Sequence, residues 1–107
     1  MAEARFRESL AIFEKVGNQR GIAECLAGLA GLRAEQGNPQ MAATLLAAAA
    51  ATQDVTGAAW WPADRVEIER NARIIRAALD EETFAAAREA GRSLSLDQAI
   101  AFALAES

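Results

Sequence analysis

Apolar residues recur every three or four positions along most of the chain, the spacing that places them on one face of an α-helix. The first such stretch covers residues 3–16, and the second runs from about residue 19 to residue 36. Gly17-Asn18 separates them, because both residues tolerate the left-handed backbone of a helix C-cap. Gly37-Asn38-Pro39 combines a C-cap glycine with a proline that can open a third helix, which reaches about Gln53. The first half of the chain is therefore expected to form three helices.

An irregular segment interrupts this pattern over residues 54–61. It has no hydrophobic period and contains Gly57, and Pro62 follows it at a position where a first helical residue can lack its N–H group. We therefore expect a boundary here, between a first group of helices over residues 1–56 and a C-terminal helical cap over residues 57–107.

Helical spacing resumes in the C-terminal part. Apolar positions predict a helix over about residues 62–79 and a shorter helix that ends at Gly91. The acids Asp80-Glu81-Glu82 begin the shorter helix, where the helix dipole favours negative charge. Ser95-Leu96-Asp97-Gln98 has the spacing of a capping box and predicts one more helix. Since no stretch alternates apolar and polar residues as a half-buried strand would, the sequence predicts an all-α fold of about six helices and no sheet.

The composition is typical of a helical chain and argues against two classes of partner. Alanine, which loses least entropy in a helix, makes up about a quarter of the 107 residues. The 11 basic and 15 acidic side chains give a net charge of −4 and are interspersed, without the basic stripe that nucleic-acid binding requires. The N-terminus lacks the pattern of a signal peptide, and the longest apolar run is far shorter than the roughly 20 residues that span a bilayer. We therefore expect a cytoplasmic protein that binds no membrane and has no direct nucleic-acid partner.

The residue types argue against an enzyme. Histidine is absent, and a single cysteine cannot assemble a zinc site; we expect Cys25 to be buried as a small apolar side chain. Gly28 and Gly31 lie in a helical pattern without the lysine of a phosphate-binding loop. Each costs about 1 kcal/mol relative to alanine, so these glycines are expected to mark the close approach of a neighbouring helix. We expect no catalytic residue, no metal and no cofactor.

Part of the chain matches a known helical repeat. The matching small and apolar residues are Leu26, Leu29-Ala30, Gly37, Ala42, Leu46 and Ala49. Their spacing resembles that of a tetratricopeptide repeat, with Arg33 in place of the usual aromatic residue at a helix contact. The resemblance implies tetratricopeptide-like antiparallel helix hairpins over residues 1–56, closed by a capping helical hairpin within residues 57–107.

Taken whole, the chain resembles the C-terminal end of large bacterial regulators that join a signalling ATPase to a helical-repeat region, often with a LuxR-type DNA-binding domain. The segments that carry this resemblance are residues 9–18, 20–26 and 91–99. In that family the repeat region senses an inducer or docks a partner and relays this to the ATPase. The resemblance thus implies a part in signalling and transcription regulation.

Two features are candidates for partner binding. Trp60-Trp61 are adjacent large aromatics in the irregular segment, and aromatics are enriched at binding hot spots; alternatively, they pack onto the helix pairs. Arg70, Arg73 and Arg76 recur every third residue, so they occupy a broad sector of one helix that could receive an anionic ligand or an acidic partner. The alternative for these arginines is ordinary solvated surface, with ion pairs to glutamates of the same helix.

The leading hypothesis is a protein–protein interaction or effector-sensing module within a larger regulator. A second hypothesis is a small-molecule domain whose inducer pocket lies between helix pairs, near Trp60-Trp61 and Cys25; a third is a structural cap with no ligand. Self-association through Phe6, Leu10 and Phe13 is also expected if the first helix has lost an upstream neighbour. A deep closed pocket would favour the inducer hypothesis, and an open groove would favour docking.

Overall fold

The computed structural model describes residues 2–56 and 62–104, and within them the chain forms six α-helices and no strand. The helices are α1 (Ala2–Val16), α2 (Gln19–Glu35), α3 (Pro39–Thr56), α4 (Pro62–Ala78), α5 (Glu81–Ser93) and α6 (Leu96–Leu104). This confirms the predicted all-α fold. None of these helices is long and apolar enough to cross a membrane, for the described part of the chain.

The first two turns are built by the same dipeptide, twenty positions apart in the sequence. Gly17 and Gly37 have positive φ angles of 73° and 81°, as expected for C-cap glycines. The N–H groups of Asn18 and Asn38 each donate to the carbonyl five residues earlier, at 2.9 Å in both turns. Each asparagine side chain also accepts from the N–H of the third residue of the next helix, at 3.1 Å and 3.3 Å. The glycine C-caps are confirmed, whereas Asn18, which was expected to tolerate the same left-handed backbone, has a φ of −84° and instead caps the start of α2.

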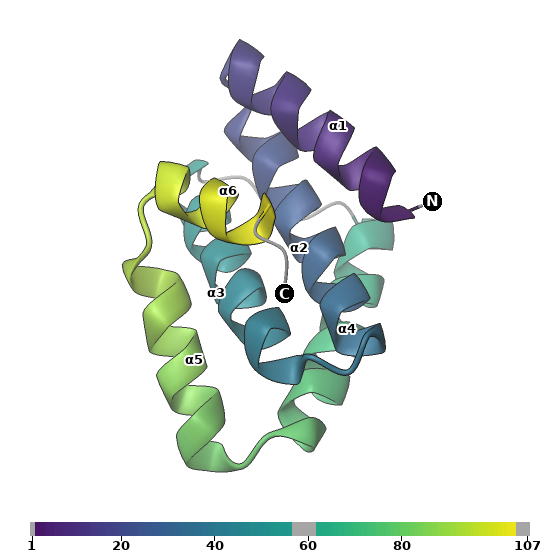
Figure 1. The fold of residues 1–107 in the computed structure, drawn as a ribbon, viewed down its shortest axis with the longest axis vertical. Coiled ribbons are helices and arrows are strands. Elements are labelled where there is room, and N and C mark those ends of the chain that lie inside the picture. Colours follow the sequence, from purple (N-terminus) through teal and green to yellow (C-terminus); the bar gives the residue numbers. More distant parts are fainter. Residues whose placement is uncertain (1, 57–61, 105–107) are drawn as a thin grey trace.

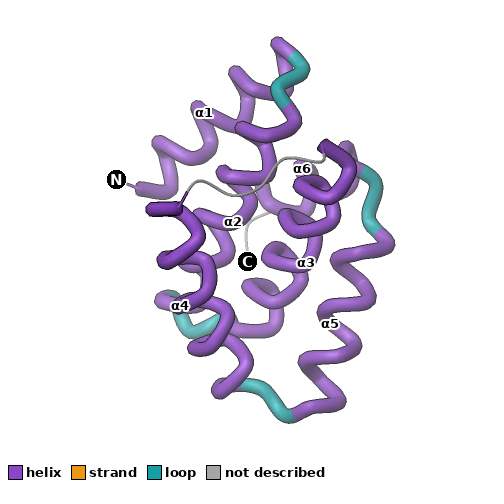
Figure 2. The backbone as a smooth tube through the Cα atoms, turned by 180° about the vertical axis from the view of Figure 1, so that it is seen from behind, coloured by secondary structure: helices purple, strands orange, loops and turns teal. Residues whose placement is uncertain are grey.

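The α2–α3 hairpin stands at the centre of the molecule, and the other helices pack around it (Figure 1). α1 packs against α2, and α5 runs beside α3. α4 contacts both helices of the hairpin, and α6 crosses one end of it (Figure 2). The consecutive helices α4, α5 and α6 therefore pack chiefly on the central hairpin rather than on one another.

The core joins both halves of the chain. The largest fully buried side chains in the described residues are Leu10, Ile22, Leu26, Leu29, Leu45 and Ile75. One cluster unites α1, α2 and α3 with the buried face of α6, and a smaller one unites α3 with Ile75 of α4 and Ala87 of α5. The described residues on both sides of the predicted boundary, 2–56 and 62–104, thus contribute to a shared core.

Glycines allow three helices to approach α2 and α3 closely. A Cβ added at Gly28 would collide with the ring of Phe6 on α1, and one added at Gly31 would lie 2.5 Å from the Asn71 Nδ2 atom on α4. This confirms that both glycines mark the close approach of a neighbouring helix. Gly91 has the same role between α5 and α3, since its added Cβ would meet the backbone carbonyl of Thr44.

The last two helices depart from the expected hairpin. The capping box at the start of α6 is present: Ser95 Oγ accepts from the N–H of Gln98 at 3.1 Å, and Gln98 Oε1 accepts from the N–H of Ser95 at 2.9 Å. However, the buried residues of α5, Ala87 and Gly91, lie against α3, and α6 packs into the main core. The two helices therefore cap the molecule separately instead of as a tightly packed pair. The tetratricopeptide-like stacking remains a prediction.

The expected self-association set needs one correction. Leu10 is fully buried in the core of its own chain, because its face of α1 packs on α2. Phe6 and Phe13 are half-buried beside the same core. The large apolar side chains that α1 does expose are Ile12 and Val16. A self-association surface on α1 cannot include Leu10 in the folded chain, and self-association itself stays a prediction.

Candidate functional site

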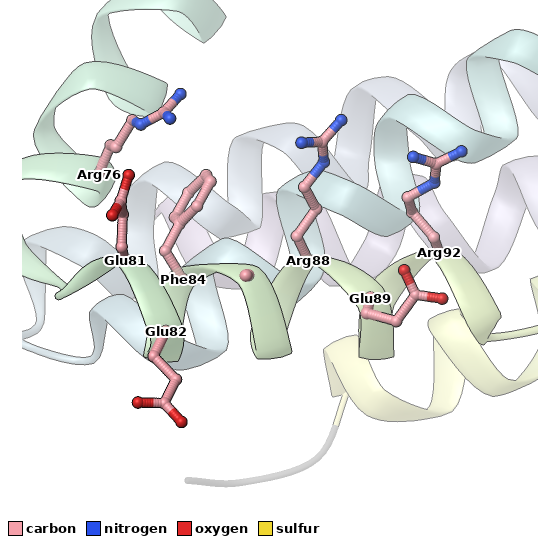
Figure 3. A pocket seen from close by; sticks show the side chains of 8 residues that line it. Arg76, Glu81, Glu82, Phe84, Arg88, Glu89 and Arg92 are labelled. Atoms are coloured by element: carbon pink, nitrogen blue, oxygen red, sulfur yellow. The ribbon is translucent and has the colours of Figure 1, made fainter.

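A hollow of about 660 Å³ runs along α5 and reaches the end of α4 (Figure 3). Its lining residues are Arg76 from α4 and Glu81, Glu82, Phe84, Ala85, Arg88, Glu89 and Arg92 from α5. The small residues of α5, Ala87 and Gly91, face α3, so that positions 84, 88 and 92 form the next face of the helix at a spacing of four residues. We call the surface formed by Arg76, Phe84, Arg88 and Arg92 the arginine groove.

The arginine groove has an aromatic platform at one end. The guanidinium carbon of Arg76 lies 5.1 Å from the centroid of the Phe84 ring, a distance at which the cation is attracted to the ring face. The side chains of Arg88 and Arg92 extend to the side of α5 on which Arg76 of α4 lies, and the Glu81 side chain extends to the same side, whereas Glu82 extends toward the opposite side (Figure 3). The groove thus presents three cations along one edge, with the Glu81 carboxylate beside Arg76.

The three arginines of the groove lack the ion pairs that two other arginines, both on α4, form. Within residues 2–56 and 62–104, none of the three guanidinium groups of the arginine groove forms an ion pair or a hydrogen bond. By contrast, Arg70 pairs with Glu67 at 3.8 Å, and Arg65 pairs with Glu69 at 3.1 Å. The donors of the arginine groove are therefore available to a ligand.

The structure places only one of the three arginines that were predicted from the sequence in the groove. Arg76 belongs to the groove, but Arg70 and Arg73 do not line it. Arg70 forms the expected pair with Glu67, whereas Arg73 is exposed and has no ion pair among the described residues. Trp60-Trp61 lie outside the residues that the structure describes. The three arginines separate because a spacing of three residues drifts around a helix that turns every 3.6.

Sequence reasoning missed Phe84, Arg88 and Arg92 as site residues. In the structure Phe84 is half-buried, and Arg88 and Arg92 are exposed. The available signal was the spacing of four from Phe84 through Arg88 to Arg92, which places them on one helix face.

A second hollow of about 360 Å³ lies between α1, α2 and α4. Its apolar lining is Phe6, Phe13, Cys25, Ala27, Gly28 and Ile68, and its polar lining is Arg5, Ser9, Glu24, Glu67 and Asn71. Cys25 is buried and free, which confirms its expected position. Burial, with a smaller contribution from the charge of Glu24, raises the pKa of the Cys25 thiol to about 11.

Cys25 is expected to react with iodoacetamide much more slowly in the folded chain than in urea, because burial both shields the thiol and keeps it protonated. The free energy of unfolding should also fall as the pH rises from about 8.5, the usual pKa of a thiol, toward 11. In that interval the unfolded chain loses the proton first, so raising the pH favours unfolding. Mass spectrometry measures the labelling, and Cys25→Ala should lose this alkaline effect. Equal labelling rates in the folded chain and in urea would contradict the burial of the Cys25 thiol.

Arg33 is a buried charge that the sequence did not reveal. Its residue is 2% exposed, and its guanidinium is ion-paired with the Glu3 carboxylate of α1 and donates to Gln36 Oε1 at 2.8 Å. The hydrogen bond from Arg33 holds the pKa of Glu3 below its usual value, against a smaller opposing effect of desolvation. Arg33 therefore ties the start of α1 to the end of α2.

Comparison of the chain with protein-family models, with curated proteins and with solved structures found no match.

Proposed function

We propose that this chain is a protein-docking module of a cytoplasmic bacterial regulator and that its partner binds along the arginine groove. The observation that carries the proposal is the row of three guanidinium groups beside an aromatic ring, none of them paired within the described residues. Arginine and aromatic side chains are the types most enriched at interface hot spots. An open groove on a helix face also suits a protein segment better than a small molecule.

The resemblance to the repeat region of bacterial regulators supports the same proposal. In those proteins a helical-repeat region docks a partner or senses an effector, and this chain would act in the same way. Trp60-Trp61, Arg70 and Arg73 remain candidate contacts beyond the groove.

A site-specific photo-crosslinker tests this function. Benzoylphenylalanine replaces Ala85, which lines the groove, and in a control it replaces Ala50, an exposed residue of α3 outside both hollows. We expect position 85 to crosslink to one protein that mass spectrometry identifies in the native host, and that protein, once purified, to bind the unmodified chain. Crosslinks of equal yield at both positions, or none at position 85, would count against docking at the groove.

A second candidate is an inducer-binding domain, and the hollow between α1, α2 and α4 favours it. Its volume of about 360 Å³ falls within the usual range of ligand sites, and its lining is mainly apolar and includes Cys25. Under this alternative, an apolar small molecule should raise the melting temperature of the chain. Ser9→Trp, which fills the hollow, should abolish that rise.

A further inference from the structure

We infer that the partner segment bound in the arginine groove is acidic, with carboxylates one helical turn apart. The inference rests on the proposed docking function and names the chemistry of the partner. Arg88 and Arg92 are four residues apart on α5, so their side chains emerge one turn apart on the same face. Glutamate or aspartate side chains at the same spacing on a partner helix would lie opposite them.

Each arginine of the groove offers five N–H donors in a planar fork that matches the two oxygens of a carboxylate. Among the described residues, Arg88 and Arg92 use none of these donors in an ion pair or a hydrogen bond. The guanidinium carbon of Arg76 lies over the Phe84 ring, 5.1 Å from its centroid. This cation–π contact leaves the N–H donors of Arg76 able to bind a carboxylate, because the ring face accepts none of them as an ordinary hydrogen bond.

A protein segment fits the surrounding charges better than a nucleic acid does. Glu81, Glu82 and Glu89 also line the hollow, and the whole chain carries a net charge of −4. A phosphate backbone is uniformly negative and would be repelled by these glutamates. An acidic protein segment can instead place apolar or basic side chains beside them and still reach the arginines with its carboxylates.

Fluorescence anisotropy with the full chain tests this inference. The probe is a fluorescein-labelled helical peptide of alanine, leucine and glutamine with two glutamates four residues apart on one face and one lysine on the neighbouring face, and its control carries lysine in place of both glutamates. Arg88→Glu combined with Arg92→Glu removes the groove cations. The matched control is Lys15→Glu combined with Arg65→Glu, which reverses two exposed cations, on α1 and α4, that lie outside the groove and are not candidate contacts. Both double variants change the net charge equally.

We expect the glutamate peptide to bind, and the groove double variant to bind it at least about tenfold more weakly, while the matched control changes the dissociation constant less than about twofold. Binding should weaken as salt is raised, because the contacts are exposed ion pairs. Arg88→Gln with Arg92→Gln should weaken it in the same direction, and this pair serves if the charge reversal prevents folding.

Three results would overturn the inference: no binding of the glutamate peptide, equal binding of the lysine peptide, or equal losses in both double variants. Binding of a labelled oligouridylate RNA that the groove substitutions abolish would also overturn it, since the site would then recognise phosphate. If the peptide fails while the crosslinker at Ala85 still identifies a partner, the acidic chemistry is wrong and docking stands. If no partner crosslinks at position 85, the docking function itself fails.

Discussion

Gly91→Ala is expected to destabilise the protein by about 1–3 kcal/mol, the usual cost of overpacking a tight contact. The added Cβ would meet the carbonyl oxygen of Thr44 and would lie 2.8 Å from the Ala47 Cβ and 3.1 Å from the Ala48 nitrogen. Two of these contacts are backbone atoms of α3, which cannot rotate away as a side chain can. The substitution must therefore push α5 off α3.

The sign of this effect makes the test sharp. At an exposed helix position, replacing glycine by alanine stabilises by about 1 kcal/mol, because alanine has the higher helix propensity. Ala86→Gly, at an exposed position of the same helix, measures that propensity term in α5. Urea unfolding gives the free energy for each variant. If Gly91→Ala gains as much stability as Ala86→Gly loses, α5 does not lie as close to α3 as described. Because the arginine groove lies on α5, Gly91→Ala should also weaken partner binding.

Glu3→Ala is expected to destabilise the fold more than the loss of any exposed ion-pair partner. The Arg33 guanidinium is buried, and removing its carboxylate leaves a charge in the interior without a counterion. Glu3→Gln should cost less, since its amide oxygen still accepts a hydrogen bond. Glu3→Ala combined with Arg33→Met should regain stability, because no buried charge is then left unpaired.

Glu69→Ala is the matched control, since its partner Arg65 is exposed and the pair is screened by water. Thermal unfolding followed by circular dichroism measures each variant. Equal changes in Glu3→Ala and Glu69→Ala would mean that Arg33 reaches water in solution, contrary to the structure.

The same ion pair predicts a dependence on acid. The pKa of Glu3 is lowered in the folded chain by the Arg33 hydrogen bond, so the unfolded chain takes up the proton first as the pH falls. The stability that Glu3 contributes is therefore present above the usual pKa of a glutamate, about 4.3, and is lost below it. Glu3→Gln should flatten this part of the pH profile relative to the original chain.

The six helices and several of their limits were predicted from the sequence because local chemistry sets them. Gly91 was wrongly predicted to end a helix: it lies inside α5, which continues to Ser93, because its role is to let α5 approach α3. The left-handed glycines at positions 17 and 37 and the capping box at Ser95 each act within a few residues of the chain. Gly28 could be read as a close contact because glycine inside a helix has a cost that packing must offset. Its neighbour could not be named, since many helices could have supplied the ring that Phe6 provides.

The site depended on tertiary structure. Arg76 was recognised as a candidate, but its neighbours in space are Phe84 and the arginines of α5 rather than Arg70 and Arg73. The charged Arg33 side chain is buried because the start of α1 places the Glu3 carboxylate next to it, where the two form an ion pair. Short-range periodicity and capping thus determined the six helices of the described chain, while the packing of α4 and α5 on the central hairpin decided which charges share a groove. The reason is that helix periodicity acts through bonded neighbours, whereas a groove is made by residues whose proximity depends on how whole helices bury their apolar faces.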